Sequence, residues 1–440
     1  MTVSPSAPPI LIVAVDGLDW HLLLPAMQEG KVPHLLQLAR RGTAARLTTF
    51  EPTDSPVIWT SVATGKRKEK HGIHSFAQRV DGRLIPMTSN QRLARPFWDI
   101  LGEAGDTVAT IGWWVTWPAE PLNGWMVAPV ASLTGRTWKG SLYPDMPEQT
   151  WPPDLLDEIR PVIRRVEREA PALLAQRWPS PPGSIPDWVT EFRRDLGWTI
   201  ATDRIFTDVA EEILRRHHPR VLAVYQGAID VAGHRFWGYT FNDGEPSARP
   251  HLEPGTTEVL AGYLPTLVEN LDDALGKLLA IMPKGSDVLI LSDHGMHGRL
   301  PGAVRGPGRH PLARYNTGAH GNAPDGVFIA AGPSFRVTKP AFTVPSSVER
   351  LPRLGDELHP SVLDITPTLL ALHGLPAAAD MDGIPLDELL VGRAGMRSSS
   401  PKPVTYEKGP PPLSQPRPIH GPADDDVIRR LRSLGYLDGR

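Results

Sequence analysis

The sequence contains no cysteine, and this absence excludes several kinds of site. Disulfide bonds, iron–sulfur clusters and zinc sites with thiolate ligands all require cysteine side chains. Any metal ion in this protein would therefore be held by histidine nitrogens and carboxylate oxygens. Such ligand sets suit zinc or manganese.

Long hydrophobic runs and a surplus of one charge are also missing. The longest strongly apolar run, Ile10–Val15, ends at Asp16 and is too short to cross a membrane. No basic region precedes it and no small-residue cleavage site follows it, so we expect no signal peptide. The 46 basic and 49 acidic side chains give a net charge of −3, which provides no basic field for a nucleic-acid polymer. We therefore expect a cytoplasmic protein without a membrane span; no pattern indicates an oligomeric state.

Short apolar runs bounded by turn residues predict the fold class. Runs of this length without polar alternation are typical of strands buried on both faces, as in a parallel sheet. The clearest are Ile10–Val15, Val108–Ile111, Val221–Tyr225, Val288–Leu291 and Val327–Ala331. Helical patterns lie between them, at Pro33–Arg41, Asp203–His217, Leu264–Ile281 and Val362–His373. This alternation predicts an α/β fold with a doubly wound, mostly parallel sheet flanked by helices.

Changes in composition predict the domain organisation. Residues 136–199 carry many prolines and charges but no pattern of a buried strand, and we interpret them as a mostly helical cap insertion. The core would then comprise residues 1–135 and 200–395. Residues 396–423 read as a proline-rich linker. Residues 424–440 read as a C-terminal helix and tail, in which acidic residues precede basic ones as the helix dipole favours.

Acidic and histidine residues follow several of the predicted strands, where open α/β sheets bind their ligands. The set comprises Asp16, Asp230, His234, Asp293, His294 and His320. Taken singly, each has an ordinary explanation: Asp16 can cap a turn, and His320 can be a structural histidine. Taken together, three carboxylates at one sheet edge would repel one another unless cations lay between them. Two divalent ions would offset these charges and leave a net positive charge that attracts a phosphate anion.

A loop rich in hydroxyl groups precedes a probable helix in the segment 51–65. Thr53 and Ser55 lie near the amino end of that helix, where an anion is favoured. A hydroxyl in this place can serve as a nucleophile, and ordinary capping of the helix is the alternative reading.

These residues together resemble the alkaline phosphatase superfamily, and its type I phosphodiesterase/nucleotide pyrophosphatase-like branch in particular. The resemblance covers most of residues 9–395, with all motifs in matching order and spacing. The motifs are VDG at 15–17, SPVIWTSVATG at 55–65, KHGI at 70–73, Asp230 and His234 before RFW, SDHGM at 292–296, GAHG at 318–321, and PTLLALHGLP with DMDGIPL at 367–386. LRSLGYL at 431–437 also resembles a recurrent ending of bacterial members.

The resemblance implies two neighbouring sites for divalent metal ions, zinc in the first place and manganese as the alternative. One site would use Asp230, His234 and His320. The other would use Asp16, Asp293, His294 and the Ser55 oxygen. Ser55 would be the nucleophile, with Thr53 in its place if the register of the loop shifts by two residues. The implied activity is hydrolysis of a phosphodiester or pyrophosphate bond in a small molecule, through a phosphoserine intermediate.

Two departures from the family pattern concern the substrate. In the nucleotide pyrophosphatase branch an asparagine lies three residues after the nucleophile, whereas this sequence has Ile58 there. No arginine closely follows Ser55, so the clamp that a dedicated monoesterase uses for a dianion is not evident. The alternatives are a phosphomonoesterase or phosphosugar mutase of the same superfamily, and a non-catalytic binding protein that keeps the fold.

Overall fold

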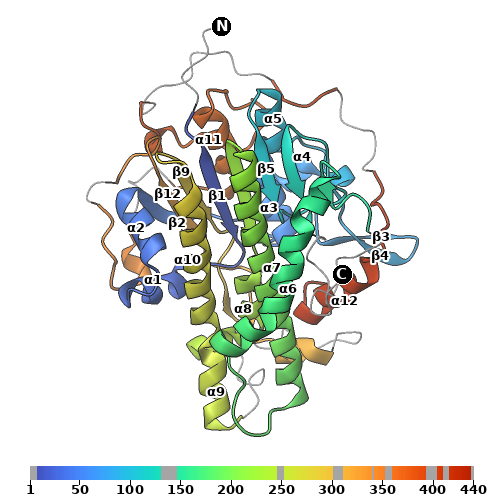
Figure 1. The fold of residues 1–440 in the computed structure, drawn as a ribbon, viewed down its shortest axis with the longest axis vertical. Coiled ribbons are helices and arrows are strands. Elements are labelled where there is room, and N and C mark those ends of the chain that lie inside the picture. Colours follow the sequence, from blue (N-terminus) through green and yellow to red (C-terminus); the bar gives the residue numbers. More distant parts are fainter. Residues whose placement is uncertain are drawn as a thin grey trace.

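Within the described residues, eight strands form one mixed sheet at the centre of the molecule (Figure 1). The computed structural model describes residues 7–129, 146–244, 252–300, 311–338, 341–351, 359–392, 404–409 and 416–437. In sheet order the strands are β2 (Thr43–Leu47), β12 (Gly326–Ala331), β9 (Asp287–Leu291), β1 (Ile10–Val15), β8 (Val221–Gln226), β5 (Val108–Ile111), β6 (Gly124–Val127) and β7 (Thr150–Trp151).

All five apolar runs of the sequence are strands of this sheet. The five strands from β9 to β6 run parallel to one another, whereas β12 and β7 run antiparallel to their neighbours. Every residue of β1 is at most 3% exposed, because the strand is central and both of its faces are covered. This burial accounts for the unbroken apolar run Ile10–Val15. The prediction of an α/β fold with a mostly parallel sheet is confirmed.

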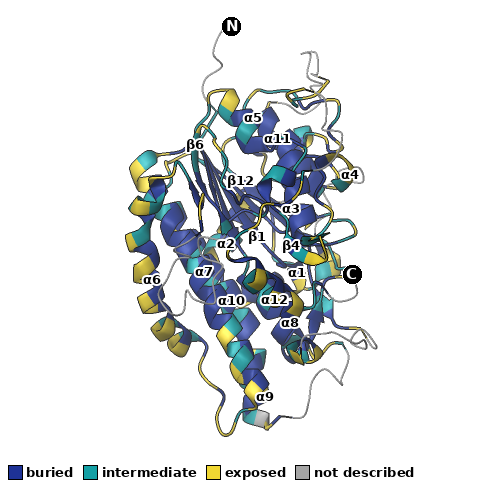
Figure 2. Ribbon diagram, turned by 90° about the vertical axis from the view of Figure 1, so that its right-hand side faces the viewer, coloured by how far each residue is buried: buried dark blue, intermediate teal, exposed yellow. Residues whose placement is uncertain are grey.

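Helices cover both faces of the sheet, which makes the fold doubly wound (Figure 2). One layer contains α2 (Pro33–Arg41), α7 (Asp187–His217) and α10 (Tyr263–Ile281). The other contains α3 (Ser55–Thr64), α5 (Phe97–Glu103) and α11 (Ile365–Leu372). The chain first extends the sheet from β1 to β2 and later builds its other half through β5, so β1 lies at the switch point between the two halves.

The remaining elements are shorter or lie outside these layers. They are α1 (Trp20–Gln28), α4 (Lys68–His71), β3 (Ala77–Val80), β4 (Arg83–Pro86), α6 (Leu155–Arg177), α8 (Ala228–Phe241), α9 (Pro254–Ala261), β10 (His297–Gly298), β11 (Gly318–Ala319) and α12 (Asp424–Leu434). In the part of the chain that the structure describes, no helix has the length and apolar character needed to pass through a membrane.

The segment interpreted as a mostly helical cap contains β7, an edge strand of the central sheet that the sequence did not predict, as well as α6 and the first part of α7. The two helices lie side by side. Residues 136–145 are outside the described ranges. α7 continues without a break into the predicted core and packs against β8 and β5. A separate cap unit at 136–199 therefore stays a prediction, and its second helix is continuous with the helical layer over the sheet.

The C-terminal helix α12 lies against the body of the protein. Of the predicted linker 396–423, the structure describes 404–409 and 416–423. α12 begins with three acidic residues and buries Ile428 and Leu431 against Phe76, next to the β3–β4 hairpin. The end of the chain is thereby brought back to the carboxyl edge of the sheet.

A buried carboxylate of α7 holds the start of α8. Asp203 accepts hydrogen bonds from the backbone N–H groups of Gly227 (2.8 Å) and Ala228 (3.0 Å). N–H groups at this end of a helix have no acceptor within the helix itself. Burial raises the pKa of Asp203 to about 7. The contact fixes α8, which carries two of the predicted site residues, relative to the sheet.

We predict that Asp203→Asn lowers the free energy of unfolding by about 1–3 kcal/mol, because the amide can accept for only one of the two buried N–H groups. Urea unfolding followed by circular dichroism measures this change. Asp187→Asn is the matched control, since Asp187 is exposed in the first turn of the same helix; its cost should stay within about 1 kcal/mol. Equal losses in the two variants would contradict the role assigned to Asp203.

Candidate metal centre

The register of three adjacent strands brings the predicted site residues to one place. Val15, the last residue of β1, lies opposite Gln226 of β8, and Ala14 lies opposite Leu291 of β9. The carboxyl ends of β9, β1 and β8 are therefore level. Asp16 follows β1 directly, and Asp293 and His294 follow β9 after one residue. The parallel pairing alone thus gathers residues that are far apart in the sequence.

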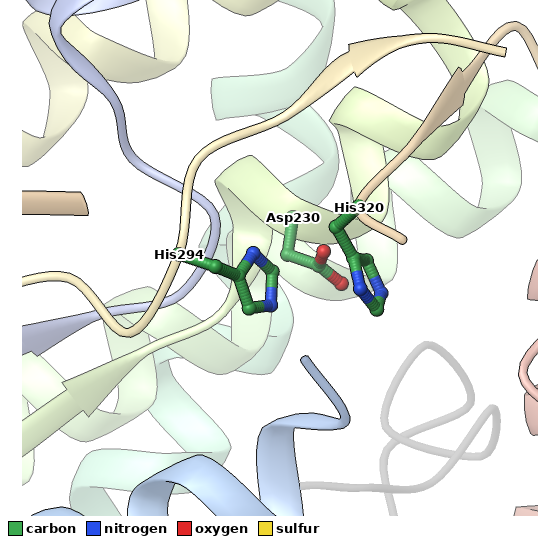
Figure 3. Close-up of side chains that lie close together, drawn as sticks. All are labelled: Asp230, His294 and His320. Carbon is green, nitrogen blue, oxygen red and sulfur yellow. The ribbon is translucent and has the colours of Figure 1, made fainter. Parts of the chain in front are cut away.

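α8 and the loop after β11 supply the other three residues. Asp230 and His234 are four residues apart on α8 and share one face, with His234 Nε2 3.5 Å from Asp230 Oδ1. His320 follows β11, and its ring stacks on that of His294 at a centroid distance of 4.3 Å. Figure 3 shows Asp230, His294 and His320 pointing toward one another from separate elements.

Two sets of three side chains have the spacing of a metal site. In one, ligand atoms of Asp230, His294 and His320 lie within 4.8 Å of one another. In the other, atoms of Asp16, Asp293 and His294 do so. His294 belongs to both sets, so the two sites adjoin. All six predicted residues are gathered in one buried cluster, while the division into ligands of each ion stays a prediction.

All three histidines turn the same ring nitrogen toward the centre. Nδ1 of His294 lies 3.0 Å from the Gly295 carbonyl oxygen. Nδ1 of His320 lies 3.2 Å from Thr53 Oγ1, and His234 is hydrogen-bonded to the Gly318 backbone. These acceptors place the proton on Nδ1 and leave Nε2 with a free lone pair. Burial lowers the pKa of each of the three rings, that of His234 to about 3, and so keeps them neutral.

The carboxylate of Asp16 has one oxygen held by the core and one facing the centre. Oδ2 accepts hydrogen bonds from the Tyr225 hydroxyl (2.5 Å) and from the indole N–H groups of Trp59 (3.2 Å) and Trp114 (3.4 Å). Oδ1 lies 3.4 Å from Ser55 Oγ and 3.5 Å from His294 Nε2. No pattern in the sequence indicated these three aromatic partners.

The carboxylates of Asp293 and Asp230 are also held through one oxygen each. Asp293 accepts from the Gly17 N–H through Oδ1 (3.3 Å), and its Oδ2 lies 3.3 Å from His294 Nε2. Asp230 accepts from the Tyr436 hydroxyl through Oδ2. Burial, and next the charge of Asp16, raise the pKa of Asp230 and of Asp293 well above the usual range. One oxygen of each carboxylate is thus fixed and the other is turned to the centre.

Five buried atoms of this cluster have no hydrogen-bond partner among the described residues. They are Asp230 Oδ1, Asp293 Oδ2, His234 Nε2, His294 Nε2 and His320 Nε2. An unpaired buried polar atom is costly, and five that converge from separate elements need a common partner. With the carboxylates ionised and the histidines in the tautomers described, all five are acceptors, and a positively charged partner would satisfy them together. Divalent cations with nitrogen and oxygen ligands fit this set.

The two candidate nucleophiles have different surroundings. Ser55 is the first residue of α3, and its hydroxyl donates to Asp16 Oδ1 (3.4 Å). The Thr53 hydroxyl donates to the carbonyl oxygen of His320 (2.5 Å) and also meets the ring of that histidine. Thr53 therefore positions a histidine, and Ser55 is the hydroxyl in contact with the centre. His71 lies apart, hydrogen-bonded to Ser61 and Ile73.

A cavity of about 90 Å³ adjoins the centre on the side of Asp230. Trp198 and Phe206 of α7 and Leu431 and Leu434 of α12 give it mainly apolar walls. It lies at the carboxyl ends of β5 and β8, the edge of the sheet at which such folds place their ligands.

A family model described as type I phosphodiesterase / nucleotide pyrophosphatase matches residues 10–299. The chain belongs to this family. The match confirms the resemblance seen in the sequence motifs and supports the prediction of an enzyme that hydrolyses phosphoester bonds. The matched range includes five of the six clustered residues and Ser55, and His320 follows it. A search of the curated proteins finds none that matches the chain.

Solved structures resemble the chain at low identity. A phosphonoacetate hydrolase from Sinorhizobium meliloti 1021, in complex with phosphonoformate, is 16% identical with a TM-score of 0.38, covering 67% of this chain and 57% of its own. A 2-O GAG sulfatase is 14% identical with a TM-score of 0.49, covering 86% of this chain and 73% of its own. The chain thus spans little more than half the length of the phosphonoacetate hydrolase.

Gly17 permits the close approach of the loop after β1 to α8. It has a φ of +72°, and a Cβ atom there would lie 2.9 Å from Asp230 Cα. Gly30 has nearly the same φ, +71°, but a Cβ atom there would meet nothing within 4 Å. The two glycines share the backbone conformation and differ in their surroundings.

We predict that Gly17→Ala lowers the number of divalent ions bound per chain, because the added methyl group displaces Asp230 and the Asp293 contact. Metal content after dialysis, measured by mass spectrometry, checks this. Gly30→Ala is the control: it carries the same left-handed strain of about 1–2 kcal/mol but no clash. Wild-type metal content in Gly17→Ala would show that the close approach is not needed.

Proposed function

We propose that this protein is a two-metal phosphoester hydrolase in which Ser55 is the nucleophile. The observation that carries the proposal is the convergence of five unpaired buried acceptor atoms beside the Ser55–Asp16 contact. Membership of the phosphodiesterase family supplies the reaction class. We infer zinc as the metal, with manganese as the alternative, because the available ligands are histidine nitrogens and carboxylate oxygens.

The residues that would hold the ions are those given by the family motifs. Asp230, His234 and His320 would hold one ion, and Asp16, Asp293, His294 and the Ser55 oxygen the other. The shared position of His294 in the two spatial sets fits ions in adjoining sites. Bound there, the ions would supply Lewis acidity that favours the serine alkoxide and offsets the charge of the phosphoryl oxygens.

Ser55 is placed to attack a phosphorus atom. It begins α3, so the positive end of the helix dipole favours a phosphate anion beside it. Its oxygen forms a bond to phosphorus while the bond from phosphorus to the leaving oxygen breaks. Water then cleaves the serine–phosphate ester and restores the hydroxyl. This division replaces one difficult displacement by two easier ones.

The surroundings of the centre favour a diester or pyrophosphate over a monoester. A monoester dianion requires cationic groups around its free oxygens, whereas a diester has only one negative charge and a second organic substituent. The cavity beside Asp230 has apolar walls that suit such a substituent. Among the described residues, Arg430 is the cation that lines it, and its guanidinium lies over the Trp198 ring at 3.5 Å.

We predict that Ser55→Ala abolishes turnover, by roughly 10³-fold or more, because the covalent route is lost. Metal content should stay near that of the wild type, since all three carboxylates and all three histidines remain. Ser61→Ala is the matched control: Ser61 is a buried serine of the same helix, bonded to His71 away from the centre. Undiminished turnover of Ser55→Ala would refute the nucleophile assignment.

We predict that the metal-loaded protein hydrolyses bis(p-nitrophenyl) phosphate faster than p-nitrophenyl phosphate. Release of nitrophenolate, followed by absorbance, measures both rates, and chelation should stop both. Faster cleavage of the monoester would favour the phosphomonoesterase alternative. Transfer of phosphate between sugar hydroxyls without release of phosphate would favour a mutase, and a failure to bind metal would favour a non-catalytic binding protein.

A further inference from the structure

The end of the chain reaches the metal centre. We propose that Tyr436 is a positioning residue for Asp230, so that the C-terminal helix α12 is needed to complete one of the two metal sites. This inference rests on the proposed function, because it gives Asp230 the role of a metal ligand. It concerns a residue outside the range that the family model matches.

Tyr436 contacts the centre with both its hydroxyl and its ring. The hydroxyl donates a hydrogen bond to Asp230 Oδ2. The ring meets that of His234 edge to face, with centroids 4.9 Å apart and an interplanar angle of 85°. The same ring stacks on Phe76, with centroids 4.4 Å apart and an interplanar angle of 12°. The tyrosine is therefore held between a core phenylalanine and two predicted ligands of one ion.

Among the described residues, the Tyr436 hydroxyl is the group that donates to Asp230. Asp16 and Asp293 are held by donors from Tyr225, Trp59, Trp114 and Gly17, all of which belong to the sheet and the loops and helix beside it. The hydrogen bond that holds Asp230 comes instead from Tyr436, which follows α12. Its second oxygen, Oδ1, has no hydrogen-bond partner and faces His234 Nε2 at 3.5 Å. Tyr436 thus determines which oxygen of Asp230 is free.

α12 is anchored beside the other ligands of the same site. Arg235, the neighbour of His234, donates to the Ser433 carbonyl oxygen (2.8 Å) and to Ser433 Oγ (3.1 Å). Asn316, which precedes β11 and the loop of His320, donates to the Leu434 carbonyl oxygen (2.9 Å). These contacts satisfy carbonyl groups at the end of the helix. Gly435, with a φ of +94°, then turns the chain so that Tyr436 faces Asp230.

The energetic reason lies in the charge of Asp230. A metal ligand whose second oxygen is hydrogen-bonded is fixed in orientation, and its charge is partly compensated. Without the hydroxyl, Oδ2 would be buried without a donor, and the carboxylate would be free to rotate. Loss of such supporting contacts in metal sites costs about 10–100-fold in affinity. The loss should fall on the Asp230 site, because the Asp16 and Asp293 contacts are independent of the tail.

The test is Tyr436→Phe in the full-length chain, titrated with Zn²⁺ against a chelator of known affinity. We expect two binding steps in the wild type. In the variant, one step should weaken by about 10-fold or more and the other should be unchanged. Tyr406→Phe is the matched control, because Tyr406 also lies late in the chain and donates to the Pro376 carbonyl oxygen (2.7 Å) away from the centre. This control should bind both ions as the wild type does.

Wild-type affinity at both steps in Tyr436→Phe would overturn the proposal. Equal weakening of both steps, with a lower unfolding temperature of the metal-free variant, would also overturn it, because that result marks a purely structural contact. The readout is metal affinity and not hydrolysis. A protein that binds two ions but cleaves no phosphoester would therefore contradict the proposed reaction and leave the role of Tyr436 to be decided by the titration.

Discussion

The repulsion among three buried carboxylates is the constraint on which the rest of this site depends. Asp16, Asp230 and Asp293 are each at most 3% exposed, and water cannot screen their charges. In each of these carboxylates, one oxygen accepts a hydrogen bond from a donor of the protein. The second oxygen faces the centre of the cluster. The oxygens that face the centre converge with three imidazole nitrogens, an arrangement that bound cations would stabilise.

The clustered residues and the donors that orient them come from different parts of the fold. Asp16, Asp293 and His294 come from strand ends that parallel pairing makes level, and the other three clustered residues come from α8 and the loop after β11. The donors that orient them come from side chains of α3, from the segment after β5, from β8 and from the end of the chain. A bulky tyrosine or tryptophan supplies a single polar group at the tip of an apolar body, which allows it to pack in the core and still bond a carboxylate. Trp59, Trp114 and Tyr225 surround Asp16 in this manner.

The sequence allowed prediction of the fold and of the clustered residues because both depend on local pattern. The apolar runs mark buried strands such as β1 and β9, and an acid placed directly after such a run has to lie at the sheet edge. Asp230 and His234 could be paired because their spacing is that of one helical face. The partners Tyr225 and Tyr436 could not be found in this way, since a tyrosine within an apolar or helical segment has the same appearance whether its hydroxyl meets solvent or a carboxylate. The position of α12 is set by contacts to Phe76, Arg235 and Asn316 that no local pattern encodes.

The hydrogen bond between Tyr436 and Asp230 also has a consequence for the order in which the protein matures. Asp230 lies 206 positions before Tyr436, and the other clustered residues also precede Tyr436 in the sequence. During synthesis these residues emerge first, so the sheet can assemble before the donor for Asp230 is present. Until α12 has docked, Asp230 would be oriented less firmly than in the folded protein. Completion of the cluster is thereby linked to the docking of α12.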